Sequence, residues 1–559
     1  MKNDLNINGV TYYDVAKLKV KRSGENTYAE LVDTSDANAI ASEIMSGKTG
    51  YVNGTKVIGT YTPPTIVSPA ATGSIIVSDG NQQLLENVIS FFDEYGMLLH
   101  TVDTTDTSAF PLSELPSLPT AITGYTFSWN KTLSEVNDMT TGGCVYTRVV
   151  ASALSPTVLI PHDIGWYNGG FTLAFKGVGE SVTLTIDWGD GSTASTVNVS
   201  GTRGVTSSHT FSALSHNPIT ITPSTDNKYG LGTGASGNGL LGNTFTNQFV
   251  RLKEVRIGAG AIIQDYAFSS YYGLRNMIIP EGITSIPRYA FYRDYSLISI
   301  NIPNGVTDIV EHAIEQCYGL LEAILPSTIT NIGNYVFQNC NALKSIAIPS
   351  SAVAMGISVF LGCYSLPEIS IPNTITSFGA NMFTSCSSLR KVTLGNGITS
   401  IPDGTFFSCH TLATIDLPTT ITSIGQGAFN ECRALSSIDI TNVIAISNQA
   451  FNGCSSLQTV TIGTALTTIG ASAFAGCYSL AAITLPSSVT NIGNNAFSGC
   501  NSLQVLAVNS ITPPTLGSNA ISQGYTGIYY LEITVPSESL NAYKTATNWV
   551  AYAENIVGV

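Results

Sequence analysis

The chain has 559 residues, of which 43% are hydrophobic and 11% charged, and its net charge is −14. This length is enough for several domains with buried cores. The negative charge argues against binding to nucleic acid, which depends on Lys and Arg, and gives no attraction to anionic membrane surfaces. No run of about 18 apolar residues occurs, so the sequence predicts no membrane span.

Residues 1–62 have the pattern of a small α/β module. Between residues 33 and 46, Ala37, Ile40 and Ile44 share one face, which predicts a short amphipathic helix. Residues 51–57 contain a central Asn-Gly pair, which predicts a β-hairpin. The N-terminus has no apolar run after its basic residue, so we do not expect a Sec-type signal peptide. We therefore expect the protein to be synthesised in the cytoplasm.

Two segments in the first 160 residues resemble parts of known proteins. The segment SGKTGYVNGTKVIGT, preceded by NINGVTYYDVAKLKV, resembles the N-terminal modules of tailed-phage structural proteins. Residues 63–160 are interpreted as a linker and small connector, in which LPSLPT precedes a Gly- and Trp-containing motif at residues 124–129, as in the same proteins. The resemblance implies that residues 1–62 bind other tail proteins.

Residues 161–225 alternate between apolar and polar side chains, as in half-buried strands. A Trp-Gly-Asp-Gly phrase ends at Gly191, and His209-Thr-Phe follows about 20 residues later. This spacing resembles the β-sandwich of the polycystic-kidney-disease type (PKD-like). We interpret Asp190 as a tight-turn residue, with a calcium ligand as the alternative, and His209 as a packed strand residue. Residues 226–251 are rich in Gly and predict a connecting loop.

Residues 252–510 repeat with a period of 23 residues, and one step of 22 lies between Phe429 and Phe451. Such a period predicts a solenoid in which each coil buries its apolar face against its neighbours. The first part of each unit reads S-L-x-x-I-x-I-P. When its Leu is counted as position 1, the side chains at positions 1, 4 and 6 are predicted to point into the core. The aromatic column consists of Phe268, Phe291, Ile314, Phe337, Phe360, Phe383, Phe406, Phe429, Phe451, Phe474 and Phe497.

The agreement of the Leu, Ile, Phe and Cys columns resembles the BspA-type (Treponema-type) leucine-rich repeat. The resemblance implies adhesion to cells, matrix or other bacteria. Residues 511–559 predict a C-terminal cap of one strand, ending at Pro536, and a helical segment over residues 537–556. A cap is required because the last coil otherwise exposes a sheet edge.

Nine of the ten cysteines occur once per repeat, from Cys317 to Cys500, and Cys144 stands apart. One interpretation is disulfides between neighbouring coils, and the other is a line of buried free thiols. We favour thiols, because coils about 4.8 Å apart are near the lower limit of disulfide geometry. Evenly stacked single cysteines do not converge four ligands on one zinc ion.

No catalytic motif is evident, and we expect neither enzymatic activity nor a cofactor. The six histidines are scattered, and neither a G-x-S-x-G elbow, an H-E-x-x-H motif nor a phosphate-binding loop occurs.

The outward strand positions hold the candidate site, because most are small and polar and the charges gather in the middle of the stack. Glu368 and Lys391 share a column on adjacent coils, and Asp416 and Asp439 share another. The alternatives are a solvated face, a ligand-binding site, and a pair of carboxylates for glycoside hydrolysis. Tyrosines cluster in the first repeats, where either sugar stacking or coil packing explains them. The candidate ligand-binding residues are Glu368, Arg390, Lys391, Asp416 and Asp439.

The sequence therefore predicts a multidomain, mainly β protein. It consists of a small α/β module, a PKD-like sandwich, a parallel leucine-rich-repeat solenoid and a strand-helix cap. The favoured function is a phage tail-fibre or receptor-binding protein, located in the virion, that binds a host cell-surface protein or glycan. The alternatives are a bacterial cell-surface adhesin and a surface-glycan depolymerase. A homo-oligomer is possible, although no heptad run indicates a trimer.

Overall fold

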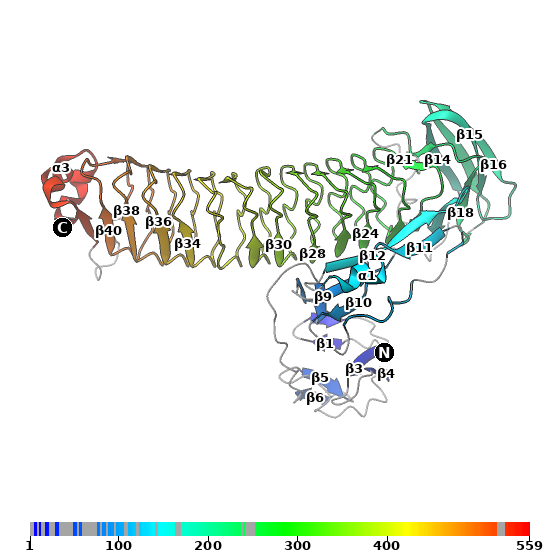
Figure 1. Cartoon of the computed structure of the whole chain (residues 1–559), viewed down its shortest axis with the longest axis horizontal. Coiled ribbons are helices and arrows are strands. Elements are labelled where there is room, and N and C mark those ends of the chain that lie inside the picture. The colour runs from blue at the N-terminus through cyan, green and yellow to red at the C-terminus, as the bar shows by residue number, and fades with distance from the viewer. Residues whose placement is uncertain are drawn as a thin grey trace. The chain divides into compact units, whose positions relative to one another are not determined.

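Figure 1 shows the computed structural model, in which the chain forms two units, Met1–Pro69 and Ala70–Val559. Up to residue 88 the structure describes only the backbone of strands. From residue 89 to residue 559 it describes the chain except for residues 94, 96, 105–109, 119–121, 124, 140–142, 162–168, 214, 236–238, 241–251 and 522–530. Within the described residues, no helix has the length and apolar character needed to cross a bilayer.

The described residues of the first unit form three antiparallel pairs of short strands. β5 (Thr49–Val52) pairs with β6 (Thr55–Ile58), which confirms the hairpin predicted around Asn53 and Gly54. The helix predicted over residues 33–46 lies outside the described residues. The other two pairs are β1 (Leu5–Ile7) with β2 (Val10–Tyr12) and β3 (Lys17–Lys21) with β4 (Tyr28–Val32).

The segment predicted to be a linker and connector contains a folded sheet. After a hairpin of β7 (Ile75–Ser78) and β8 (Asn81–Leu84), four strands form a sheet in the order β10-β9-β12-β11. The Trp129 indole donates to the Pro116 carbonyl at 2.9 Å, so the proline phrase packs on the Trp motif. Its elements are β9 (Val88–Phe92), β10 (Leu98–Asp103), β11 (Tyr125–Trp129), α1 (Leu133–Asn137) and β12 (Gly143–Ala151).

Residues 157–231 form a two-sheet sandwich whose inward side chains are apolar, as the alternation predicts. One sheet contains β16-β15-β18-β13, and the other contains β17-β14-β19. The strands are β13 (Thr157–Pro161), β14 (Gly169–Gly177), β15 (Gly179–Asp187), β16 (Ser195–Gly201), β17 (Gly204–Phe211), β18 (Ile219–Pro223) and β19 (Tyr229–Leu231).

Both sheets of the sandwich continue into the solenoid. β13 pairs antiparallel with β20 (Leu252–Arg256), and β19 pairs parallel with β21 (Ala261–Ile263). The expectation that residues 226–251 are only a loop is therefore wrong, because β19 begins at Tyr229 and extends a sheet. One hydrophobic core runs from Leu159 in the sandwich to Ile556 near the C-terminus. The sandwich thus covers the apolar end of the first coil.

The repeats form the predicted parallel solenoid, with two strands per typical coil (Figure 1). We call the face formed by the first strand of each coil the strand face. Its strands are β20, β22 (Asn276–Ile278), β24 (Ser299–Asn301), β26 (Glu322–Ile324), β28 (Ser345–Ile346), β30 (Glu368–Ser370), β31 (Lys391–Thr393), β34 (Ser437–Ile440), β36 (Thr459–Ile462), β38 (Ala482–Leu485) and β40 (Val505–Val508).

The second strands are mostly only two residues long. They end at an Ile, Met or Leu that points into the core, such as Ile309 and Ile332. They are β21, β23 (Ser285–Ile286), β25 (Asp308–Ile309), β27 (Asn331–Ile332), β29 (Ala354–Met355), β32 (Ser400–Ile401), β33 (Ser423–Ile424), β35 (Ala445–Ile446), β37 (Thr468–Ile469), β39 (Asn491–Ile492) and β41 (Thr515–Leu516).

The Phe column is a continuous stack in the centre of the core. Neighbouring rings from Phe337 to Phe497 lie 5.2–5.8 Å apart and nearly parallel. The turn around each Phe has a left-handed residue on both sides, as at Asn381 and Ser385 around Phe383. Small or amide-bearing residues tolerate this conformation best, which explains the Asn, Ser and Gly found there.

The nine repeat cysteines are buried free thiols, as the sequence analysis favours. Each Sγ–H donates to the carbonyl of the preceding coil's aromatic-column residue, for example Cys386 to Phe360 at 3.1 Å and Cys340 to Ile314 at 3.3 Å. The thiol therefore acts as a small apolar residue with one weak donor. Burial raises the pKa of Cys386 to about 12.

The C-terminal cap contains the predicted strand and helix and one further strand. β42 (Glu532–Val535) pairs with β40 and with β43 (Ile556–Gly558), both in parallel. The expectation that the helical segment reaches Ile556 is wrong, because Ile556 begins β43. Tyr543 and Trp549 are buried and donate to the carbonyls of Ser510 and Pro514. The cap's short helices are η2 (Ser537–Ser539), α3 (Leu540–Thr545) and η3 (Trp549–Asn555).

Asp294 occupies the position that cysteine takes in later coils. It is fully buried, and its Oδ1 accepts a hydrogen bond from the Tyr271 amide at 2.8 Å. Its Oδ2 has no hydrogen-bond partner among the described residues. Burial raises the pKa of Asp294 well above its ordinary value.

We predict that the nine repeat cysteines resist alkylation in the folded protein and all react in denaturant. The physical reason is that their thiols are buried and the thiolate is the reactive form. Peptide mapping by mass spectrometry after each treatment measures this. Recovery of disulfide-linked peptides from neighbouring coils would contradict the prediction.

We predict that Asp294→Asn stabilises the protein at pH 7. The folded state binds the Asp294 proton more tightly than the unfolded chain, so the wild type loses stability as pH rises above about 3.9, the ordinary Asp value. Asn keeps the acceptor for Tyr271 and carries no charge. The melting temperature of the variant should exceed that of the wild type at pH 7, and the difference should vanish near pH 3.

Asp226→Asn is the control, because Asp226 lies exposed on the surface. An Asp294→Asn variant that melts no higher than the wild type at pH 7 would show that the buried carboxyl carries no such cost.

Candidate ligand-binding face

The strand face is divided into a covered part and an open part. Residues 88–151, which we call the covering module, pack on the first coils of this face (Figure 1). Phe92 and Tyr146 contact Ile324, and Tyr125 and Val149 contact Ile278. Outward-pointing side chains of these coils are consequently buried.

Polar contacts fix the covering module on the solenoid. Arg148 makes a bidentate ion pair with Glu281 at 2.5 and 2.6 Å. The Asn301 side-chain amide donates to the Thr147 carbonyl at 2.9 Å, and the Tyr146 hydroxyl donates to Asn304 at 3.1 Å. Bidentate Arg–carboxylate pairs add directional specificity to the packing.

The sequence analysis did not foresee this cover, although a signal for it exists. Ile278 and Ile324 are apolar residues at outward strand positions, whereas the corresponding positions of later coils are mostly polar. Ser299 and Asn301 also point outward, yet they are 1% and 5% exposed. An apolar side chain on a face expected to be solvated indicates that another part of the chain packs there.

The open part of the strand face begins at β30, with the five candidate residues near its start. Arg390, Lys391, Asp416 and Asp439 are exposed, and Glu368 is half-buried. Glu368 and Lys391 are register partners in the parallel pair β30–β31, as predicted. The structure therefore places these residues on one solvent-facing surface.

The two aspartates differ in their surroundings. Asp416 lies on the coil that follows the coil of Lys391. It pairs with Thr393 of that coil through an isolated parallel β-bridge. Asp439 Oδ1 accepts hydrogen bonds from the Thr441 hydroxyl at 2.6 Å and the Thr441 amide at 2.9 Å. Both hydrogen bonds lower the pKa of Asp439, and the one from the Thr441 hydroxyl has the larger effect. Asp439 is thus held ionised by its own turn, without help from a ligand.

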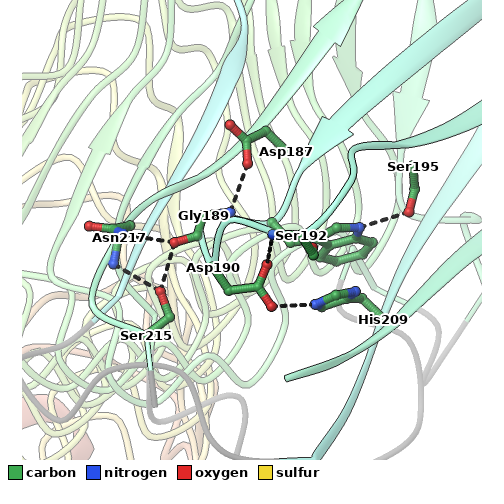
Figure 2. Close-up of polar contacts among 9 residues, drawn as sticks. Asp187, Gly189, Asp190, Ser192, Ser195, His209, Ser215 and Asn217 are labelled. Carbon is green, nitrogen blue, oxygen red and sulfur yellow. Dashed lines mark hydrogen bonds and ion pairs between the residues drawn. The ribbon is translucent and has the colours of Figure 1, made fainter. Parts of the chain in front are cut away.

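The Asp190 turn in the sandwich is a closed hydrogen-bond network (Figure 2). Asp190 accepts from the Ser192 amide at 3.0 Å and lies 2.7 Å from His209 Nε2. Gly191 has a φ of 79°, which agrees with the predicted tight turn. Partial burial raises the pKa of Asp190, but the hydrogen bonds with Ser192 and His209 outweigh it and lower the pKa to about 2.

His209 serves packing, as expected. Its ring stacks on Trp188 with centroids 4.9 Å apart, and the Trp188 indole donates to Ser195. Both carboxylate oxygens of Asp190 are therefore used within the sandwich. Across the described residues, no group of three or more His, Cys, Asp or Glu side chains is arranged to hold a metal ion.

The tyrosines of the first coils stack on each other from coil to coil. Tyr289 lies between Tyr266 and His312, with centroid separations of 4.7 and 4.5 Å. Tyr295 lies between Tyr272 and Tyr318, at 4.8 and 4.7 Å. Neighbouring rings cover their faces, so coil packing accounts for the cluster and few ring faces are available to a sugar.

Comparison with known proteins supports the repeat assignment. A family model described as the BspA type leucine rich repeat region matches residues 261–390, 376–504 and 428–543, which together span about half of the chain. No curated protein matches the chain.

Solved structures of leucine-rich-repeat proteins are similar to the repeat region. One, from Bacteroides ovatus, is 25% identical over 50% of this chain and 88% of that chain, with a TM-score of 0.28. A leucine rich cell surface protein from Faecalibacterium prausnitzii is 23% identical over 50% of this chain and 94% of its own, with a TM-score of 0.29. A Treponema pallidum leucine-rich-repeat protein is 27% identical over 33% and 78%, with a TM-score of 0.24.

We predict that a cysteine placed at Ser299 reacts slowly with a bulky maleimide, whereas one placed at Thr414 reacts quickly. Both residues occupy the same outward position of their coils, but the covering module buries Ser299 and leaves Thr414 exposed. Peptide mapping of labelled Ser299→Cys and Thr414→Cys proteins measures the two rates. Equal rates would show that the module does not cover the face in solution.

Proposed function

Since the chain belongs to the family of proteins with BspA-type leucine-rich repeats, we propose that its solenoid binds a protein or glycan on a cell surface. The observation that carries the proposal is the division of the strand face. The covering module occupies the first coils, and the face from β30 onward stays open to solvent. Solenoid proteins use such extended surfaces for binding.

The open face has the composition of a recognition surface for a polar ligand. Its outward positions are mostly Ser, Thr and Ala, with Arg390, Lys391, Asp416 and Asp439 near one end. Hydrogen bonds to charged groups are roughly twice as strong as those between neutral groups. Glu368 and these four residues would fix the register of a ligand that the neutral positions contact more weakly.

The finer proposal is that this protein is a tail-fibre or receptor-binding protein of a phage virion. The resemblance of residues 1–62 to phage structural modules supports it, and that segment would bind other tail proteins. A bacterial cell-surface adhesin is the alternative. Immunogold labelling with an antibody against the solenoid separates them, because it decorates phage tails in the first case and bacterial cells in the second.

We propose that binding involves no reaction. The candidate aspartates lie on an exposed strand face, whereas a carboxyl that acts as a catalytic acid usually sits in a buried pocket. Release of reducing sugar from host glycan, lost in an Asp416→Asn and Asp439→Asn variant, would support a depolymerase instead.

We predict that two double variants bind host cells more weakly: Arg390→Ala with Lys391→Ala, and Asp416→Asn with Asp439→Asn. The side chains point away from the core, so the fold should persist. The loss of one charge-assisted hydrogen bond costs about 1.5–3 kcal/mol, which corresponds to a decrease of at least about tenfold in affinity. Binding of labelled protein to cells measures it.

Glu538→Gln is the matched control, because Glu538 is exposed in the C-terminal cap, away from the candidate residues. Unchanged cell binding by both double variants would move the binding site away from the candidate residues.

A further inference from the structure

The 22-residue step of the repeat has a definite place in the structure. The missing residue lies in the turn after β34, where Ile440 and Val443 are three residues apart. The equivalent residues Ile302 and Val306 of an earlier coil are four apart. The shortened turn contains Thr441, which Asp439 holds through two hydrogen bonds.

The shortened turn also lies against the next coil. β34 and β36 pair over four residues, from Ser437–Thr459 to Ile440–Ile462. A Cβ atom at Gly463 would collide with the Thr441 carbonyl oxygen, so only glycine fits there. Gly463 therefore lets the turn after β36 lie directly against the shortened turn.

The strand ladder is interrupted on the other side of β36, as it also is between β22 and β24, between β28 and β30, and between β31 and β34. Among the described strands, β36 ends one sheet and β38 begins the next. The inward side chains Val460 and Ile462 of β36 are only half-buried, whereas Ile438 of β34 and Ile483 of β38 are buried. The interruption thus exposes part of the apolar core to solvent.

A groove of about 450 Å³ lies at this interruption, in the open part of the strand face. Val460, Ile462 and Ile483 contribute apolar surface, and hydroxyl and amide side chains surround it. The volume lies within the range of about 300–1,000 Å³ that is usual for small-molecule sites. The polar side chains that line the groove are Gln458, Thr459, Thr464, Thr484 and Asn509.

The charge of the surroundings limits the class of ligand. None of the side chains that line the groove is charged, so the lining offers no ionic partner to a charged group. Removing an ion from water without a partner is costly. A neutral molecule that has both hydroxyl groups and a C–H face matches the lining.

We propose that the groove between β36 and β38 binds a neutral carbohydrate, which deepens and rests on the proposed function. The C–H face of a sugar ring would lie on Val460 and Ile462, and its hydroxyls would exchange hydrogen bonds with Thr459, Thr484 and neighbouring amides. A peptide strand inserted between β36 and β38 is disfavoured. The two strands remain adjacent, and an inserted strand would have to lie about 4.8 Å from each of them.

Saturation-transfer NMR on the full chain tests the proposal. The probes are the neutral sugars maltotriose, mannotriose, lactose and triacetylchitotriose, with trigalacturonic acid as an anionic counterpart and gelatin as a peptide ligand. At least one neutral sugar should give transfer signals, and trigalacturonic acid should give none.

Ala482→Trp fills the groove from an exposed position on β38 and should abolish those signals or weaken affinity at least tenfold. Thr414→Trp, at the equivalent position three coils earlier, is the matched control and should leave them unchanged. Thr484→Arg is a second blocking variant, for use if Ala482→Trp changes the circular dichroism spectrum. The control keeps the same added ring on the same face, so it separates blocking from a general effect of Trp.

No transfer to any of the four neutral sugars, or signals that persist in both blocking variants, would overturn the proposal. Gelatin binding that Ala482→Trp abolishes would reassign the groove to a peptide. Cell binding lost in the charge variants but unchanged in Ala482→Trp, together with absent sugar signals, removes the groove and keeps the proposed function. Sugar signals lost in Ala482→Trp without any effect on cell binding keep the groove as a sugar site and show that it does not contribute to cell binding.

Discussion

Stacking between neighbouring coils is the interaction on which the rest of the structure depends. A single coil buries little by itself, because its Phe, Leu and Ile side chains contact mainly the coils before and after it. Both ends of the stack therefore need a cover. The sandwich supplies one by continuing both of its sheets into the first coils, and β43 with Tyr543 and Trp549 supplies the other.

The same constraint sets where binding can occur. Most inward positions are committed to stacking, so recognition is left mainly to the outward positions, where substitution has little effect on the core. The covering module removes the outward positions of the first coils from solvent, and Arg148 with Glu281 holds it there. The chain therefore presents a limited part of a long repetitive surface, which begins near Glu368.

The sequence predicted what depends on local periodicity and missed what depends on contacts between distant segments. The columns through Phe383 and Cys386 determine the solenoid, because stacking forces the same residue type into each coil. Asn301 is buried beneath the covering module and donates a hydrogen bond to Thr147, about 150 residues away, and no local pattern encodes that contact. Likewise, β19 is only three residues long and its pairing with β21 was hidden within a Gly-rich segment.

Regular repeats also make small departures informative. In a stack with identical spacing, each outward surface resembles the next, and a ligand has no preferred place along it. The turn after β34 is one residue shorter than in the other coils, and Gly463 of the next coil fits against it on one side. On the other side the ladder is interrupted, and Val460 and Ile462 become accessible. A specific site can thus arise in a repetitive fold where the side chains and strand pairing of neighbouring coils differ, without cost to the stacking that holds the other coils together.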